Sequence, residues 1–229
     1  MTSEMCRIAV ADGIRHIVAT PHANDRYEYD RVRFGFLLER LQEPWGDALQ
    51  FSLGCDFRFG YENTEEAIAH TQRYTIANSN YMLIELNDFG PVMAIRPGIF
   101  RLISNGLVPI VTHPERNPIL LERREQVLDL VEWGCLIQVT ASSFTGQWGE
   151  RPQHMAEWLL KRDAIHVVAS DAHDAQRRPP ILSRAYRRVS DLAGKEVAQA
   201  LFIDNPGQIV ATESGRFEKG PSSQFPNLD

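Results

Sequence analysis

Six short apolar runs in the sequence end in a residue that can bind a metal ion or activate a water molecule. Imidazole and carboxylate groups are ligands through which proteins hold the divalent cations used in hydrolysis. If these residues converge on one rim of a fold, they make a metallohydrolase centre. The ligand-type residues at the ends of the runs are His22, Asp56, Glu85, His113, Asp171 and His173.

The runs themselves have the composition of buried parallel strands, because Val, Ile and Leu dominate them. The segments between them show the spacing of apolar residues that is typical of helices. In a barrel of alternating strands and helices, the C-terminal ends of the strands meet at the rim that carries the chemistry. We therefore predict an α/β fold with strands within residues 13–22, 50–56, 81–85, 108–113, 136–142 and 165–173.

The connections between these strands favour a closed sheet. Right-handed strand–helix units curl a long parallel sheet toward a barrel. Six strands are an awkward number to close, and the chain opens on a helix near residues 5–12, so one strand is expected to be missing at the front. Further helices are predicted at residues 31–43, 64–74, 92–105, 122–133, 152–163, 181–191 and 195–202.

Two short motifs make the chemical prediction sharper. Each ligand-type residue alone is more readily explained as a helix cap, a turn or an exposed loop residue. Asp171 and His173, however, lie two residues apart just beyond an apolar run, so both can reach one centre. Arg116 follows His113 closely, and its planar guanidinium suits a phosphate group. Arg178 belongs to an arginine pair that could equally lie in a solvent-exposed surface turn. Its closeness in sequence to the Asp-x-His motif favours a role in phosphate binding.

Length, charge and composition exclude several classes of protein. The 229 residues fit one domain over residues 1–211, followed by a flexible tail over residues 212–229. A formal net charge of -6 argues against nucleic-acid binding, which depends on Lys and Arg. No apolar run is long enough to cross a membrane, and three widely spaced cysteines fit reduced thiols. We expect a cytoplasmic protein with no nucleic-acid partner and no membrane insertion.

The cysteines also argue against one phosphatase mechanism. A cysteine-dependent phosphatase needs an arginine at a fixed spacing after the nucleophile, so that the thiolate lies in a phosphate cradle. At that spacing after Cys6, Cys55 and Cys135 stand Asp12, Tyr61 and Ala141. A Gly-rich phosphate loop that ends in Lys-Ser/Thr is also absent from the sequence, which argues against nucleotide-driven phosphoryl transfer.

Several motifs, taken in order along the chain, resemble those of a single family. They are Ala19-Thr-Pro-His22, Leu83-Ile-Glu85, Thr112-His-Pro-Glu-Arg116, Gln138-Val-Thr-Ala-Ser-Ser143, Ser170-Asp-Ala-His173, Arg178-Pro-Pro180 and Phe202-Ile-Asp-Asn-Pro206. This pattern resembles the CpsB/CapC/YwqE-type bacterial protein tyrosine phosphatases of the PHP (polymerase and histidinol phosphatase) superfamily. The resemblance extends from about residue 5 to about residue 210.

The resemblance implies a distorted seven-stranded PHP-type (β/α) barrel that holds up to three metal ions, usually manganese, with magnesium, zinc or iron as other options. It implies that Arg116 and Arg178 bind the phosphate and that His173 is a metal ligand. The proton for the departing phenolate could come from His173 or from a metal-bound water. Family members begin with an Asp-x-His-x-His strand, whereas this sequence starts inside the helix that follows. The residues that match metal ligands are His22, Asp56 (where the family usually has Glu), Glu85, His113, Asp171 and His173.

The resemblance also implies a substrate. Members hydrolyse phosphotyrosine, typically on the C-terminal tail of a bacterial tyrosine kinase that controls capsular and exopolysaccharide synthesis, with a metal-activated hydroxide as the nucleophile. Two alternatives stay open: a PHP phosphoesterase acting on a small phosphate monoester such as histidinol phosphate, and a shortened, non-catalytic relative that binds the kinase or a phosphopeptide. An uncovered sheet edge would also favour a homo-oligomer.

Overall fold

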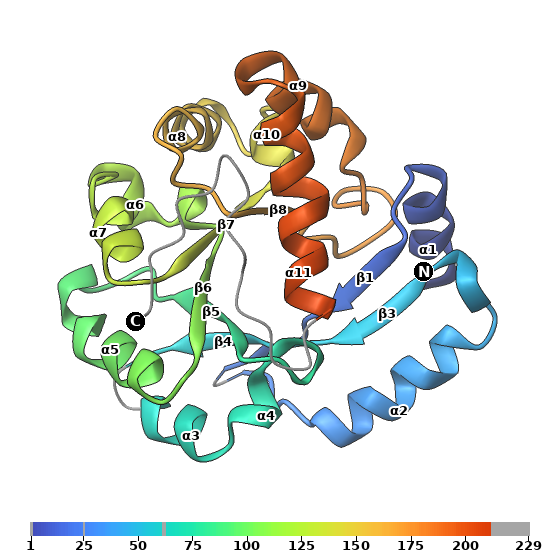
Figure 1. Cartoon of the computed structure of the whole chain (residues 1–229), viewed down its shortest axis with the longest axis horizontal. Coiled ribbons are helices and arrows are strands. Elements are labelled where there is room, and N and C mark those ends of the chain that lie inside the picture. The colour runs from blue at the N-terminus through green and yellow to red at the C-terminus, as the bar shows by residue number, and fades with distance from the viewer. Residues whose placement is uncertain (1, 25, 61–62, 212–229) are drawn as a thin grey trace.

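Parallel strands and helices alternate along the chain (Figure 1). The computed structural model describes residues 2–24, 26–60 and 63–211. The strands are β1 (His16–Ala19), β2 (His22–Ala23), β3 (Gln50–Leu53), β4 (Asp56–Phe59), β5 (Tyr81–Leu86), β6 (Val108–Thr112), β7 (Leu136–Thr140) and β8 (Val167–Ala169). The α-helices are α1 (Thr2–Ala11), α2 (Arg31–Gln42), α3 (Thr64–Ala69), α4 (Thr71–Tyr74), α5 (Arg96–Ser104), α6 (Pro118–Glu122), α7 (Gln126–Glu132), α8 (Glu150–Leu160), α9 (Ser183–Ala193), α10 (Lys195–Gln199) and α11 (Asn205–Ala211).

Shorter helical turns fill several of the connections. The 3₁₀ turns are η1 (Gly46–Ala48), η3 (Ile76–Asn78), η4 (Val92–Ile95), η5 (Pro114–Arg116) and η6 (Ala141–Ser143), and η7 (Ala200–Asp204) is a π-helical segment between α10 and α11. Within the described residues, no helix combines the length and the apolar character that crossing a membrane requires.

The sheet is parallel throughout, which confirms the predicted α/β class. Its main part has the strand order β2-β4-β5-β6-β7-β8, and β1 pairs with β3 beside it. The two parts continue one into the other, because the Gly54 amide donates to the Ala19 carbonyl at 2.8 Å and the Asp56 amide to the Pro21 carbonyl at 3.1 Å. Thus β1 and β3 lie in the strands predicted at 13–22 and 50–56. After a short bend each continues as β2 or β4, which begins at the ligand residue where the predicted strand was expected to end.

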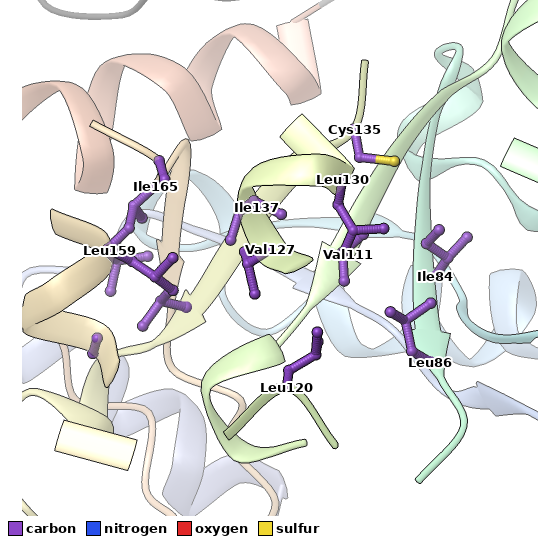
Figure 2. Close-up of a cluster of buried hydrophobic side chains, with 14 of the residues drawn as sticks. Ile84, Leu86, Val111, Leu120, Val127, Leu130, Cys135, Ile137, Leu159 and Ile165 are labelled. Carbon is purple, nitrogen blue, oxygen red and sulfur yellow. The ribbon is translucent and has the colours of Figure 1, made fainter. Parts of the chain in front are cut away.

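Both faces of the central strands are buried, which is why their sequences show no alternation of polar and apolar residues. On the outer face Ile84, Val111 and Ile137 of β5–β7 pack against the helices (Figure 2). Their sequence neighbours Leu83 and Ile110 point the other way, into a second buried cluster that includes Ile209 of α11. Since neither face meets water, each position along these strands favours an apolar residue.

Several predicted helices differ from the observed ones at their ends. The segment predicted at 64–74 divides into α3 and α4 at His70, whose φ of -128° and ψ of 46° are not helical. The helix predicted at 122–133 corresponds to α7 alone, and neither α6, which ends at Glu122, nor α11 was predicted as a helix. The predicted tail over residues 212–229 lies outside the described residues.

A cavity lies between the two outer strands of the sheet. Among the described strands, β1 pairs only with β3 and β8 only with β7, so each leaves one edge unpaired. The cavity has a volume of about 560 Å³ and is lined by residues of α1, β1, β8 and α11, among them Met5, Val18, Val167 and Ile209. At one end it reaches the rim where the strands end.

Candidate metal centre

Three ligand-type side chains from neighbouring strands meet at the rim. In the register of the sheet, His22 at the start of β2 pairs with Asp56 at the start of β4, and Glu85 lies near the end of β5. His22 Nδ1 lies 3.4 Å from Asp56 Oδ2 and 3.7 Å from Glu85 Oε2. One ligand atom from each residue fits within 4.8 Å of the others. His22 Nδ1 is also buried without a hydrogen-bond partner, so a cation would satisfy it.

A second imidazole faces the other side of Glu85. His113 Nε2 lies 3.5 Å from Glu85 Oε1 and 3.9 Å from Asp56 Oδ2. The two oxygens of Glu85 therefore face two different histidines, an arrangement in which one carboxylate can bridge two cations. The His113 amide donates to the Gln138 carbonyl at 2.8 Å, which extends the β6–β7 pairing by one residue and fixes the backbone below the imidazole.

The electrostatics of this group fit a bound cation. Burial and the neighbouring Asp56 carboxylate raise the pKa of Glu85. Burial by itself would lower the pKa of His113, but the interaction with Asp56 outweighs it, and the pKa is raised. Both shifts show that the cluster favours additional positive charge. A divalent cation would supply that charge, and imidazole nitrogen with carboxylate oxygen suits manganese, magnesium, zinc or iron.

Thr112 is a supporting residue to which the sequence alone gave no role. Its hydroxyl donates to Asp56 Oδ1 at 3.2 Å and also lies 3.3 Å from the Ile84 carbonyl oxygen. Because Oδ1 is occupied in this way, Oδ2 of the same carboxylate is left to face His22 and His113. Hydrogen bonds of this kind orient metal ligands and tune their affinity. The position of Thr112 directly before His113 was the only sequence signal for it.

Asp171 and His173 lie beyond the end of β8, on the same rim. The imidazole of His173 has its ring centroid 6.4 Å from that of His22, and its Nδ1 lies 3.8 Å from Asp171 Oδ1. Asp171 has a left-handed backbone with φ of +50°. Its Oδ2 forms an ion pair with Arg116, whose Nη2 lies 2.6 Å away, and accepts a hydrogen bond from Arg178 Nη2. The structure thus places Asp171 between the arginines and the histidines.

The two predicted phosphate-binding arginines come together at this carboxylate although they arise from different loops. Arg116 ends η5, and Asn117 after it caps α6 by accepting from the amides of Ile119 and Leu120. The Asn117 side-chain amide also donates to the Asn87 carbonyl at 3.1 Å, which ties this loop to the one after β5.

Arg178 lies in a loop that Asp174 organises by accepting from three successive backbone amides. Both arginines leave a buried Nε without a hydrogen-bond partner, so each has an unused donor. The rim therefore combines cation ligands with two convergent guanidinium groups, a combination suited to phosphate esters.

Comparison with known proteins gives a consistent result. Residues 1–211 match the family described as capsular polysaccharide synthesis, CpsB/CapC. The tyrosine-protein phosphatase CpsB of Streptococcus pneumoniae is 28% identical over 207 residues, which are 86% of this chain and 85% of that protein.

Among solved structures, one from a study of YwqE from Bacillus subtilis and CpsB from Streptococcus pneumoniae, described as metal-dependent tyrosine phosphatases, superposes with a TM-score of 0.83 at 29% identity, over 90% of this chain and 85% of that one. Histidinol phosphate phosphatase from Lactococcus lactis shares the fold, with a TM-score of 0.59 at 11% identity over 84% of this chain and 88% of that one. The family resemblance predicted from the motifs is confirmed, and the chain belongs to the CpsB/CapC family.

Proposed function

We propose that this protein is a metal-dependent phosphatase that hydrolyses phosphotyrosine in proteins. The observation that carries the proposal is the shared rim, where the ligand group His22, Asp56 and Glu85 lies beside two arginines that converge on one acceptor oxygen. The relatives CpsB and YwqE are tyrosine phosphatases, which supports the same substrate class.

Six residues at the rim are proposed to hold the cations. His22, Asp56, Glu85 and His113 would hold the first cations, and Asp171 and His173 would complete the set from the other side. When bound, a divalent cation supplies a hydroxide nucleophile at neutral pH. The oxygen and nitrogen donors favour manganese or magnesium, with zinc or iron as alternatives.

The remaining residues act on the phosphoryl group itself. Arg116 and Arg178 would grip its oxygens and stabilise the charge that spreads over them during in-line displacement. The phenol of tyrosine has a reference pKa of about 10, so the departing phenolate needs less help from an acid than an alkoxide would. His173, half-exposed at the mouth of the site, is the residue we assign to pass a proton to it.

The same reasoning extends to the setting of the reaction. We propose a tyrosine-phosphorylated bacterial kinase of capsule assembly as the partner, supported by the family description. Three buried cysteines without disulfide bonds support a reducing compartment such as the cytoplasm. The unpaired edges of β1 and β8 support self-association, and residues 1–211 are proposed to form one domain.

The unpaired edges also support a PHP-type barrel that accepts one further parallel strand. The cavity between β1 and β8 is bordered by two strand edges that pair with no other described strand, which is the environment that an added strand requires. Metal stoichiometry can be compared between this chain and a version preceded by an Asp-x-His-x-His strand. A rise in bound metal supports this proposal, and identical stoichiometry contradicts it.

The decisive experiment separates phosphate binding from metal binding. Arg116→Ala and Arg178→Ala should each lower kcat/KM on a phosphotyrosine peptide about 10- to 100-fold while bound manganese stays constant, because each removes a charge-assisted hydrogen bond. Arg177→Ala is the matched control, since Arg177 is exposed and its hydrogen bonds in the structure are made by its backbone amide and carbonyl.

Three results would contradict the proposal. Unchanged kinetics in both arginine variants would remove them from the phosphate site. Faster hydrolysis of histidinol phosphate than of the peptide would favour a small-molecule phosphatase. Tight binding of the peptide without turnover, together with little bound metal, would indicate a non-catalytic binding protein.

A further inference from the structure

The two arginines of the rim lie close together, and their mutual repulsion must be offset by other contacts. Arg116 and Arg178 both form ion pairs with the same oxygen, Asp171 Oδ2, so their guanidinium groups lie close together. Two like charges at such a distance repel each other, and the repulsion grows where burial excludes water. Neither Nε finds a hydrogen-bond partner that would fix its guanidinium plane. Some other contact must hold the pair when the shared acceptor changes.

Trp148 provides such a contact. The guanidinium carbon of Arg116 lies 4.3 Å from the centroid of the indole ring, and that of Arg178 lies 5.2 Å from it. Both distances are within the range of a cation–π interaction, in which the negative face of the ring attracts a cation. One aromatic side chain therefore contacts both of the arginines that converge on the rim.

Trp148 is itself held from two sides. Its indole Nε1 donates to Ser142 Oγ at 2.8 Å, so the ring orientation is fixed by a residue of η6. The neighbouring Gln147 donates through Nε2 to the Arg177 carbonyl, which joins the loop of Trp148 to the loop of Arg178. The ring is thus anchored independently of the carboxylate that the arginines now share.

We propose that Trp148 is a positioning residue that holds Arg116 and Arg178 ready for one phosphoryl group. The inference rests on the proposed function and identifies a residue that sets the affinity for the phosphoryl group. Because the ring contacts the guanidinium groups and not Asp171, it can keep them together when phosphoryl oxygens replace the carboxylate as acceptor. Its loss should therefore affect phosphate binding more than the chemical step or the metal content.

The test compares Trp148→Leu, which removes the aromatic face, with Trp148→Phe, which keeps a face but lacks the indole N–H. We expect Leu to raise both KM for a phosphotyrosine peptide and the inhibition constant of inorganic phosphate about tenfold, equivalent to about 1.4 kcal/mol. kcat should change less than about threefold and bound manganese should not change. Phe should stay within about threefold of the wild type in both constants.

The chain offers a matched control. Trp158 on α8 is also contacted by two arginines, with the guanidinium carbons of Arg124 and Arg162 at 4.7 and 4.0 Å from its ring centroid. Trp158→Leu removes a comparable pair of contacts away from the rim. It should leave KM and the inhibition constant of phosphate unchanged.

The outcomes separate this inference from the proposed function. If the wild type is active and Trp148→Leu leaves both constants unchanged, the inference is wrong. It is also wrong if Trp148→Phe is as impaired as Trp148→Leu, or if Trp148→Leu lowers the metal content and leaves the inhibition constant of phosphate unchanged. Should the wild type fail to turn over, calorimetric binding of inorganic phosphate to wild type and variant still tests the ring, and an absence of binding to the wild type rejects both proposals.

If the Leu variant fails to fold, Ser142→Ala takes its place. It removes the acceptor of the indole N–H and leaves the aromatic ring, so it should raise the inhibition constant of phosphate about threefold. An unchanged constant in this variant would count against the positioning role.

Discussion

Protonation of one buried histidine should make the stability of this protein depend on pH. His166, at the junction before β8, is 3% exposed. Its Nδ1 accepts from the Ile137 amide at 3.0 Å, so this nitrogen must carry no proton in the folded state. Burial lowers the pKa of His166 from its ordinary 6.5 to about 4. A proton on Nδ1 would break a strand-to-strand contact and place a positive charge in the core.

The sign and the size follow from the difference between the two states. Below pH 6.5 the unfolded chain takes up a proton at His166 that the folded protein refuses until about pH 4. Proton binding therefore lowers the free energy of the unfolded state as the pH falls through this window, and the folded protein loses stability. Between pH 7 and pH 5 the loss from this group is about 2 kcal/mol, and it approaches about 3 kcal/mol near pH 4.

The assay is urea unfolding at several pH values for the wild type and for His166→Asn. The Asn Oδ1 can accept from the Ile137 amide as Nδ1 does, but the side chain does not titrate. Groups at the metal-binding rim titrate in both proteins, so their contribution cancels in the difference. The free-energy difference between the two proteins should shift by about 2 kcal/mol in favour of the variant from pH 7 to pH 5. Parallel pH curves would refute the account of a histidine locked in its neutral form.

Three further outcomes are expected at the metal-binding rim and among the thiols. Thr112→Val should weaken manganese binding about tenfold in calorimetry, because Asp56 loses the donor that orients it; equal affinity would contradict this. Asp56→Asn should lower the metal content of purified protein, with retained stoichiometry as the opposing result. Iodoacetamide should leave the activity of the native enzyme unchanged, because burial protects the thiols and raises their pKa values; rapid labelling before unfolding would count against it. These thiols are Cys6, Cys55 and Cys135.

The strands were predictable because each central position is buried on one face or the other. Leu83 and Ile84 of β5 belong to two different buried clusters, and Ile110 and Val111 of β6 repeat this division. A run without polar interruption is the direct consequence. The ligand residues could be placed at one rim because parallel strands in sequential order bring corresponding positions together, although His22 and Asp56 lie at bends from which their strands continue.

Other features depend on contacts that no local pattern contains. The bend at Gly54 follows from close approach, since a Cβ there would lie 3.1 to 3.3 Å from side-chain atoms of three residues on other segments. The contact of Trp148 with Arg116 and Arg178 joins residues from three loops. The helix α11 is short, and its residue Ile209 is buried by residues of the inner cluster that are distant in the sequence. Each of these features can be recognised only in the tertiary structure.

The backbone at two strand ends connects the fold with the chemistry. His113 after β6 and Asp171 after β8 both have a positive φ, +38° and +50°, which costs a non-glycine residue roughly 1 to 2 kcal/mol. Strand continuation would avoid this cost but would carry each side chain along the alternating direction of the strand. The turn instead leaves His113 facing Glu85 and Asp171 facing the arginines. The same conformation also occurs at three described residues outside the rim, so the contacts that His113 and Asp171 make there, and not the strain itself, connect the turns with the chemistry.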